Sequence, residues 1–487
     1  MPDAAAQDAG VCSYGGRRGR HRERRGLDPP VRAICGRCRM SSDSTLLSRI
    51  DHLVVLMLEN RSFDNMLGFL YTDQGNRPSG QSFEGLTGAE SNPDGNGGKV
   101  TVFPIDHTRP GAYFMPGSVP GEEYHRVNNQ LFGTQQVPTP APDATNEGFV
   151  TDFAQIFPTR KGNSPGVTAS DIMGCFPPEA LPVLSGLARG YAVCDHWYCS
   201  VPTQTLPNRG FALAGTSLGL VSDKACENQA KINRFMFKTD SIFGRLSEKG
   251  IGWAIYGYNL PPLTRANFPD TQRAGDQHFG HFIDFKNAAS EGSLPAFAFL
   301  EPAWKQDGNS QHPNDDVASG EQFILDVYNA LRTGPDWAKT LLVITYDEHG
   351  GCYDHVPPPV GAASPDQQAG EAGFDFTRFG VRVPTVLVSP LIARGTVFNV
   401  PGDSVPLDHT SVLKTIQQRW GVAPLTARDE AAPGIGGVLT LDEPRDDNPL
   451  HGVIVPVSTG RNPARAVTSH LEQVYNSLVA ENVLPSP

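Results

Sequence analysis

The sequence has few cysteines, no long hydrophobic run and more acidic than basic residues. Its eight cysteines in 487 residues are irregularly spaced, which excludes a small protein held together by disulfides. No stretch approaches the roughly 20 apolar residues of a membrane-spanning helix. The net charge of −12 disfavours a nucleic-acid partner, because phosphate backbones would be repelled. What is left is a large folded protein without an integral membrane segment, whose oligomeric state stays open.

The N-terminal segment differs in composition from the rest of the chain. "GGRRGRHRERRGLDPPVRAICGRCR" (15–39) is rich in arginine and lacks the apolar core of a secretion signal. We therefore expect residues 1–47 to be a disordered extension, with Met40 as an alternative start, and the protein to be cytoplasmic. Cys35 and Cys38 have the spacing of a zinc knuckle but no second pair nearby, which favours an incidental pair.

Apolar runs of strand length alternate with segments of helical spacing in the remaining sequence. We expect strands at 52–58, 191–198, 340–346 and 383–390, and helices at 321–332 and 408–421. This alternation predicts an α/β fold with a mainly parallel sheet and helices on both of its faces. We interpret residues 48–487 as a single catalytic domain. Its long loop insertions, chiefly 71–180, would form the rim of a pocket.

Acidic residues follow two of the predicted strands. Glu59 and Asn60 come directly after the first, and Asp347 and Glu348 come after "TLLVITY". Ligands of open α/β sheets bind beyond the carboxyl ends of the strands. One acid in such a position often only caps a helix, but two adjacent pairs of oxygen donors indicate a shared divalent cation. The spacing leaves the identity of the metal open.

The segment "SVPTQTLPNRGF" (200–211) offers a nucleophile for such a metal. The hydroxyl of Thr205 would become reactive if a metal or a base lowered its pKa. Arg209, four residues further on, would place a fixed cation near a phosphoryl group. If this segment stood alone, its threonines would be interpreted as ordinary turn residues.

Five segments together resemble one known family. They are "ENRSFDNMLG" (59–68), "SVPTQTLPNR" (200–209), "QHPNDDVASGE" (311–321), "YDEHGGCYDHVPPP" (346–359) and "LDHTSVLKTIQQRWG" (407–421). In this order they resemble the phosphoesterase family of bacteria, fungi and plants, which contains non-specific phospholipases C and related acid phosphatases. The resemblance implies an alkaline-phosphatase-like α/β fold.

The resemblance also implies roles for individual residues. The metal ligands would be Glu59, Asn60, Asp347, Glu348 and Thr205. Thr205 would in addition be the nucleophile. His312 and His355 match pocket histidines that steady the phosphoryl group or protonate the leaving oxygen.

One position departs from the family pattern. Glu122 stands where many members have a histidine in a D-P-G-H element, and His125 is one turn further on. Glu122, Arg209 and His281 are therefore our expected substrate-binding residues, and the substrate range is open.

The remaining histidines are interpreted mainly as structural residues. His52 and His196 are interpreted as structural, and His349 is left open. We expect Asp408 to cap a helix, with His409 packed behind the site.

These residues favour a metal-dependent phosphoester hydrolase with a threonine nucleophile. A phospholipase C acting on phospholipid is the first interpretation, and an acid phosphatase acting on small soluble phosphomonoesters is the alternative. A non-catalytic protein on the same scaffold is disfavoured, because none of the five expected ligands is missing. Sulfatase chemistry is disfavoured as well, because oxidation of a threonine would give a ketone and not a formylglycine.

Overall fold

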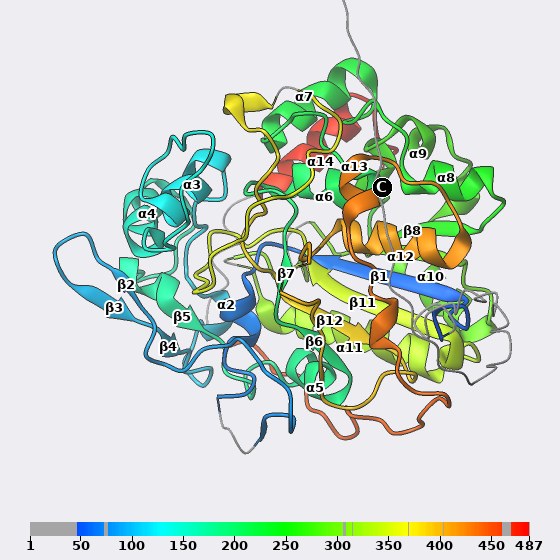
Figure 1. Ribbon diagram of the computed structural model, residues 1–487, viewed down its shortest axis with the longest axis horizontal. Helices are drawn as coiled ribbons and strands as arrows, with labels where there is room; N and C mark the ends of the chain where they lie inside the picture. The colour runs from blue at the N-terminus through cyan, green and yellow to red at the C-terminus, as the bar shows by residue number, and fades with distance from the viewer. Residues whose placement is uncertain are drawn as a thin grey trace, which may run out of the picture. The chain divides into compact units, whose positions relative to one another are not determined.

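An eight-stranded sheet runs through the centre of the protein (Figure 1). The computed structural model describes residues 46–72, 76–304, 308–313, 315–368, 370–402, 404–459 and 469–486. From one edge to the other the strands are β13 (Thr396–Val397), β6 (Ala192–Cys194), β12 (Thr385–Val388), β11 (Thr340–Tyr346), β1 (His52–Leu58), β10 (Phe297–Glu301), β8 (Trp253–Gly257) and β9 (Phe279–His281). Only β12 is antiparallel to its neighbours within this sheet. The prediction of a mainly parallel sheet is confirmed.

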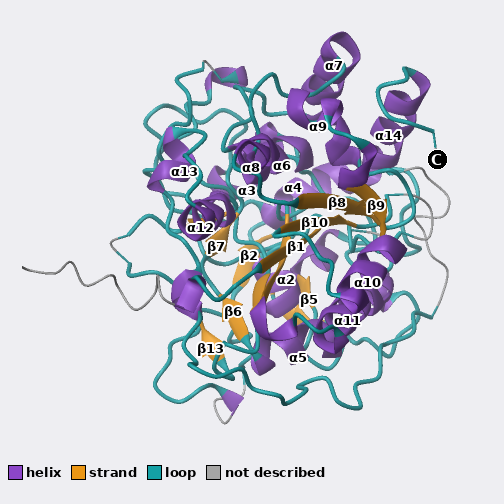
Figure 2. Cartoon of the chain, turned by 90° about the vertical axis from the view of Figure 1, so that its right-hand side faces the viewer, coloured by secondary structure: helices purple, strands orange, loops and turns teal. Residues whose placement is uncertain are grey.

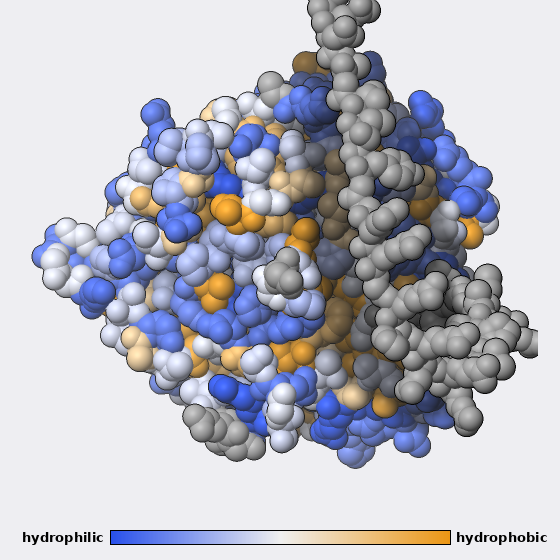
Figure 3. Space-filling view, viewed as in Figure 1, coloured by the Kyte–Doolittle hydropathy of each residue, from blue (hydrophilic) through white to orange (hydrophobic). Residues whose placement is uncertain are grey.

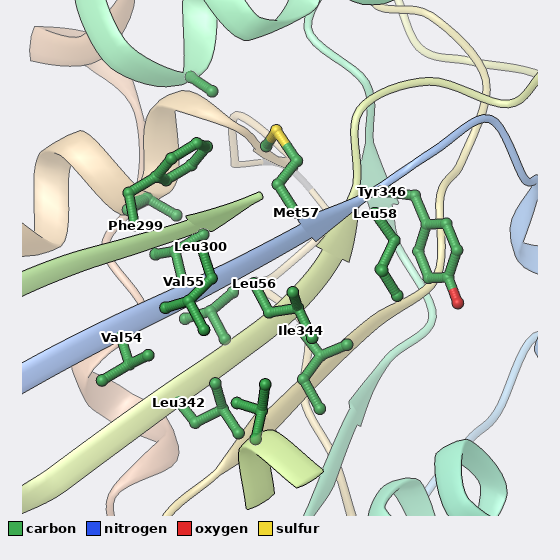
Figure 4. Close-up of a cluster of buried hydrophobic side chains, with 14 of the residues drawn as sticks. Val54, Val55, Leu56, Met57, Leu58, Phe299, Leu300, Leu342, Ile344 and Tyr346 are labelled. Atoms are coloured by element: carbon green, nitrogen blue, oxygen red, sulfur yellow. The ribbon is translucent and has the colours of Figure 1, made fainter. Parts of the chain in front are cut away.

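The two central strands are long and buried on both faces. Six of the seven residues of β1 and all seven of β11 are buried. Figure 4 shows side chains of β1, β10 and β11 packed together, among them Val55, Leu300 and Ile344. Because both faces of these strands are covered, their sequences are continuous apolar runs. The ends of those runs predicted the bounds of the two strands correctly.

Helices cover both faces of the sheet (Figure 2). On one face lie α5 (Pro182–Gly190), α10 (Phe282–Glu291) and α11 (Val317–Thr333). On the other lie α6 (Thr205–Ala214), α8 (Ile242–Glu248) and α12 (Thr410–Trp420). The shorter or more peripheral elements are α2 (Phe63–Leu67), α7 (Asp223–Asn233), α9 (Pro269–Arg273), α13 (Ala427–Ala431), α14 (His470–Ala480), β7 (Trp197–Tyr198) and β14 (Leu407–Asp408). The predicted helices correspond to α11 and α12.

The insertion at 71–180 has more regular structure than its composition indicates. It contains β2 (Ser91–Pro93), β3 (Lys99–Thr101), β4 (Phe103–Pro104), α3 (Tyr124–Phe132), α4 (Phe149–Ile156) and β5 (Gly174–Cys175). Val127, Leu131, Phe149 and Phe153 form a second hydrophobic cluster within it. The long insertion is confirmed, and it folds around its own small core beside the sheet (Figure 1).

Residues 41–487 form one compact unit. Whether they act as a single catalytic domain stays a prediction. The expected extension lies almost wholly outside the described residues, as do Cys35 and Cys38. None of the helices that the structure describes combines the length and the apolar character needed to cross a membrane.

Candidate active site

The ends of β1 and β11 bring the predicted acids together. The two strands run in parallel, with Leu58 paired to Tyr346. The residues that follow them, Glu59 and Asn60 on one side and Asp347 and Glu348 on the other, are therefore neighbours at the carboxyl edge of the sheet. All four are at most 3% exposed. We call these four residues the Glu59 cluster.

Asn60 connects this cluster to two other segments. Its backbone N–H donates to Asp347 Oδ1 at 3.1 Å, and its Nδ2 donates to Glu122 Oε2 at 2.8 Å. Its Oδ1 accepts a hydrogen bond from Thr205 Oγ1 at 3.2 Å. Asn60 has a positive φ of 55°, a conformation that asparagine tolerates better than most residues. The predicted ligand Thr205 and the predicted substrate residue Glu122 thus both lie against the cluster.

Thr205 occupies the first position of α6. Thr205 is 2% exposed. The N–H groups at the start of a helix carry partial positive charge, which favours anions. Asn208 orders the preceding loop: its Oδ1 accepts from Val201 N at 3.0 Å, and its Nδ2 donates to carbonyls including that of Gln204 at 3.1 Å. The asparagine of the segment TLPNR (205–209) therefore has a structural role: Asn208 fixes the loop that precedes Thr205.

Arg209 is directed at the cluster. Its Nε donates to Asp347 Oδ2 at 3.0 Å, and its guanidinium lies 4.9 Å from the centre of the Trp304 ring. Its Nη1 has no hydrogen-bond partner among the described residues. Arg209 thus holds Asp347 in place, and Nη1 is the atom left for a substrate contact.

Charge in the Glu59 cluster is not balanced by protein groups. Arg209 is the partner of Asp347, whereas Oε1 of Glu59 and Oε1 of Glu348 are buried without a hydrogen-bond partner in the described part of the chain. Burial raises the pKa of Glu59, and the nearby Asp347 raises it further. Burial, followed by Glu122 and Asp347, raises the pKa of Glu348. Buried carboxylates are costly unless paired, so these two free oxygens, with the amide and hydroxyl oxygens beside them, fit a hard divalent cation.

Two glycines allow the loop after β11 to close on the site. A Cβ on Gly350 would lie 2.1 Å from the carbonyl oxygen of Asn60, and one on Gly351 would lie 2.4 Å from that of Gly121. Both have positive φ. The backbone N–H of Gly350 also donates to Glu348 Oε2 at 2.6 Å. The pair of glycines is therefore required by close approach of the backbone.

Three histidines surround the cluster. His312 Nε2 lies 3.8 Å from Glu122 Oε2, and its Nδ1 is 2.9 Å from the carbonyl of Pro313. His349 Nε2 is 2.8 Å from Gln130 Oε1, and its Nδ1 lies 3.3 Å from Glu348.

His409 Nε2 is 2.6 Å from the carbonyl of Asp347, and its Nδ1 accepts from Trp197 at 3.3 Å. As expected, His409 packs behind the site. Asp408 accepts from the backbone N–H of Thr410 at 3.0 Å, at the start of α12.

His355 belongs to a second group of buried charges, which we call the Arg382 cluster: Asp64, Asp354, His355 and Arg382. One ligand atom from each of the first three lies within 4.8 Å of the others, an arrangement compatible with a metal. Arg382 already spans both acids, with 2.9 Å from Nη2 to Asp64 Oδ1 and 2.9 Å from Nε to Asp354 Oδ1. His355 Nδ1 is 2.6 Å from Asp64 Oδ2. The catalytic role expected for His355 stays a prediction, because its described polar contacts go to this cluster and to Glu84.

Two further predicted positions lie apart from the cluster. His281 ends β9, at the sheet edge three strands from β1, and is exposed. It lines a separate hollow with Arg265 and Asp284. His125 is exposed on α3, whereas Glu122 contacts Asn60. Neither histidine is part of our proposal below.

Sequence reasoning missed two residues that hold the site. Gln130 positions His349, as described above. Asp223 Oδ1 accepts from the backbone N–H of Leu206 at 2.7 Å, next to Thr205. Asp223 follows Ser222, a normal helix start, so the sequence signals only the cap of α7, and its contact with α6 is tertiary.

The fold and the site together define an α/β enzyme with buried acids and a threonine at the carboxyl edge of its central strands. The chain belongs to the phosphoesterase family, whose model matches residues 50–423. Membership makes it a phosphoester hydrolase and confirms the resemblance inferred from the five segments.

Curated relatives cover most of the chain. Non-specific phospholipase C6 of Arabidopsis thaliana is 36% identical over 417 residues, which are 83% of this chain and 75% of that protein. Non-specific phospholipase C3 of the same plant is 34% identical over 84% of this chain and 77% of that protein. Phospholipase C A of Mycobacterium tuberculosis (strain ATCC 25618 / H37Rv) is 28% identical over 81% and 77%.

Among solved structures the likenesses are distant. A putative sulfatase from Bacteroides thetaiotaomicron has a TM-score of 0.32 at 13% identity, covering 55% of this chain and 70% of that one. A phosphonate monoester hydrolase of Agrobacterium radiobacter has a TM-score of 0.31 at 12% identity, covering 53% and 72%.

Proposed function

We propose that this protein is a metal-dependent phospholipase C that uses Thr205 as its nucleophile. The observation that carries the proposal is the single connected group formed by Asn60, Asp347 and Thr205, beside carboxylate oxygens that lack a protein partner. Such a group is suited to binding a cation and delivering a hydroxyl to the same point. The similarity to proteins named phospholipase C supports the choice of reaction.

The ligands of the metal would be Glu59, Asn60, Asp347, Glu348 and Thr205. A bound divalent cation would polarise a phosphoryl oxygen and favour ionisation of the threonine hydroxyl. Arg209 keeps Asp347 in position for this role.

The protein's own groups then account for two displacements at phosphorus. Oγ1 of Thr205 loses its proton and forms a bond to phosphorus, while the bond from phosphorus to the diacylglycerol oxygen breaks and that oxygen takes up a proton. Water next attacks the phosphothreonine, which releases the phosphorylated head group and restores the hydroxyl. The positive end of the α6 helix dipole would favour the negative charge that develops on the phosphoryl oxygens, although the Leu206 N–H already donates to Asp223 and Pro207 has no N–H. We assign His312, whose Nε2 lies 3.8 Å from Glu122 Oε2, to contact with the leaving oxygen.

Glu122 favours a diester over a monoester as substrate. Its carboxylate accepts from Asn60 and therefore lies within the site. Burial, followed by the charges of Glu123 and Asp223, raises the pKa of Glu122 to about 7. In its charged form Glu122 would repel the dianion of a phosphomonoester more strongly than the single charge of a phosphodiester. This argument supports phospholipid over soluble phosphomonoesters.

The surface does not decide between lipid and soluble substrates. On the face in Figure 3, hydrophobic residues are scattered among hydrophilic ones. The large hydrophobic side chains that are exposed in the described residues are Ile232, Ile283, Val360, Ile454 and Val457. Scattered hydrophobic residues of this kind are normal on protein surfaces.

An assay of two substrates side by side tests the function. The purified protein is supplied with individual divalent metals and offered phosphatidylcholine vesicles or p-nitrophenyl phosphate. We expect release of phosphocholine and diacylglycerol, with slower turnover of the monoester. Turnover of the monoester alone would identify a phosphatase. No turnover of either with any metal would refute the proposal.

A further inference from the structure

The C-terminal helix α14 lies next to α7 (Figure 1). It begins at His470 and lies beyond residues 50–423, the part of the chain that the family model matches. Its buried side chains are Leu471, Val474, Tyr475 and Leu478. The helix is thus packed firmly enough to hold its first residues in place.

The start of α14 is tied to the active site by its capping residue. Ser469 Oγ accepts from the backbone N–H of Glu472 and donates to the carbonyl of Trp304 at 3.1 Å. The ring of Trp304 lies against Arg209, the partner of Asp347. A short chain of contacts therefore connects the helix to the Glu59 cluster.

His470 makes a second connection, toward the nucleophile. Its Nδ1 lies 3.2 Å from Oδ2 of Asp223, whose other oxygen accepts from the backbone N–H of Leu206. The backbone N–H of Asp223 donates to Gln204 Oε1 at 3.2 Å. Asp223 is thus bonded to residues on both sides of Thr205.

The position of Asp223 creates an electrostatic problem for an anionic substrate. Its carboxylate is 1% exposed and lies against the N-terminus of α6, where a phosphoryl group would bind in the proposed reaction. An unpaired negative charge there would oppose the attraction of the helix amides. His470 is the cationic partner that the structure provides: Nδ1 and Asp223 Oδ2 form an ion pair without the geometry of a hydrogen bond, and the histidine side chain is 39% exposed.

The surrounding groups favour the charged form of His470. Burial lowers its pKa, but Asp223, and more weakly Glu122 and Glu227, raise it to about 9. The imidazolium is therefore present at neutral pH.

We propose that His470 is a positioning residue that neutralises Asp223 and thereby sets the affinity of the Thr205 site for phosphoryl anions. This inference rests on the proposed function, because it assumes that the site takes a phosphoryl group. It differs from a purely structural role, in which the pair would only fasten α14 to α7.

Binding of inorganic phosphate to the full-length protein, followed by calorimetry with and without added Mg²⁺, tests the inference. We expect His470→Gln to weaken phosphate binding about tenfold, the effect of one charge interaction of moderate strength. The double variant His470→Gln, Asp223→Asn should restore binding to near the wild-type value, since it removes the uncompensated carboxylate. The asparagine still accepts the Leu206 N–H. His451→Gln, which removes an exposed histidine elsewhere, should change nothing.

Two results would overturn the inference: phosphate binding by His470→Gln within twofold of wild type, or a double variant as weak as the single one. If His470→Gln does not fold, Asp223→Asn measured at about pH 6 gives the test, because a histidine of ordinary pKa is still mostly charged there and, without the carboxylate, should make phosphate bind more tightly than in wild type. Turnover separates this inference from the proposed function. If the wild type hydrolyses esters but the substitutions leave the phosphate affinity unchanged, only the inference is refuted. A wild type that neither hydrolyses an ester nor binds phosphate refutes both.

Discussion

The protein contains two clusters of buried acids only a few residues apart in sequence, and they are balanced differently. In the Arg382 cluster, Asp64 and Asp354 share a guanidinium, and each of their four carboxylate oxygens has a partner. In the Glu59 cluster, three carboxylates have one arginine between them, and two oxygens have no partner among the described residues. The first arrangement is complete within the protein, whereas the second needs a cation from outside.

This difference shows that acid clusters are to be distinguished by their partners and not by their spacing. Judged by the positions of its ligand atoms, the Arg382 cluster is compatible with a metal. Its hydrogen bonds argue that it is structural. A cluster whose carboxylate oxygens are all paired stabilises the fold, and one with carboxylate oxygens left without a partner is available for chemistry.

The largest expected effect comes from Thr205, whose hydroxyl donates to Asn60 of the Glu59 cluster. We expect Thr205→Ala to lower turnover of phosphatidylcholine by at least about a thousandfold, because the nucleophile and one oxygen donor are lost together. Its melting temperature should stay close to that of wild type. Thr205→Ser, which keeps a hydroxyl, is the matched variant and should retain part of the rate. Activity of the alanine variant near the wild-type level would refute the covalent mechanism.

Arg382 should affect stability more than any group in the Glu59 cluster. Arg382→Met leaves Asp64 and Asp354 buried without a counter-charge and should lower the free energy of unfolding by about 3–5 kcal/mol. Glu59→Gln removes a buried carboxylate whose Oε1 has no hydrogen-bond partner among the described residues, so in metal-free protein it should leave stability unchanged or higher. Denaturant unfolding of both variants, in the presence of a chelator, measures the contrast. Equal losses would mean that the two clusters are not different in kind.

A smaller effect is expected from pH. Burial lowers the pKa of His355, but its hydrogen bond to Asp64 and the charges of Asp64 and Asp354 raise it to about 9. Because an unfolded histidine titrates near 6.5, the stabilisation is complete below that pH and is lost as the pH rises through about 9.

Wild type should therefore lose about 2 kcal/mol of unfolding free energy from this group between pH 6 and pH 9.5. The His355→Gln variant should lack this part of the pH dependence of the unfolding free energy. The comparison is made by denaturant unfolding at the two pH values. Parallel pH dependence of the two proteins would contradict the assignment.

The central part of the fold was predictable because its signal is local. β1 and β11 are continuous apolar runs with acids after them, and their observed bounds match 52–58 and 340–346. The strand expected at 383–390 is observed as the shorter β12 (Thr385–Val388). Its antiparallel direction depends on its pairing with β11, which no local sequence pattern indicates. The run at 191–198 divides into β6 and β7 for the same reason.

The site was predictable where motifs join neighbouring residues, and less so where it depends on distant contacts. The four residues of the Glu59 cluster meet because parallel strands end at one edge. Glu301 shows the limit of that argument: it also ends a strand, β10, yet it accepts from the backbone N–H groups of Leu263 and Thr264. The approach of Asp223 and His470 to Thr205 depends on the packing of α7 and α14. No local sequence pattern indicates this packing.

Bound metal tests the central distinction most directly. Wild type, Glu59→Gln and His355→Gln are each dialysed against the metal that supports most activity, and then analysed for metal per chain by plasma mass spectrometry. We predict about one tightly bound divalent ion in wild type and in His355→Gln, and loss of that ion in Glu59→Gln. Metal retained by Glu59→Gln but lost from His355→Gln would place the metal at the Arg382 cluster and contradict the account.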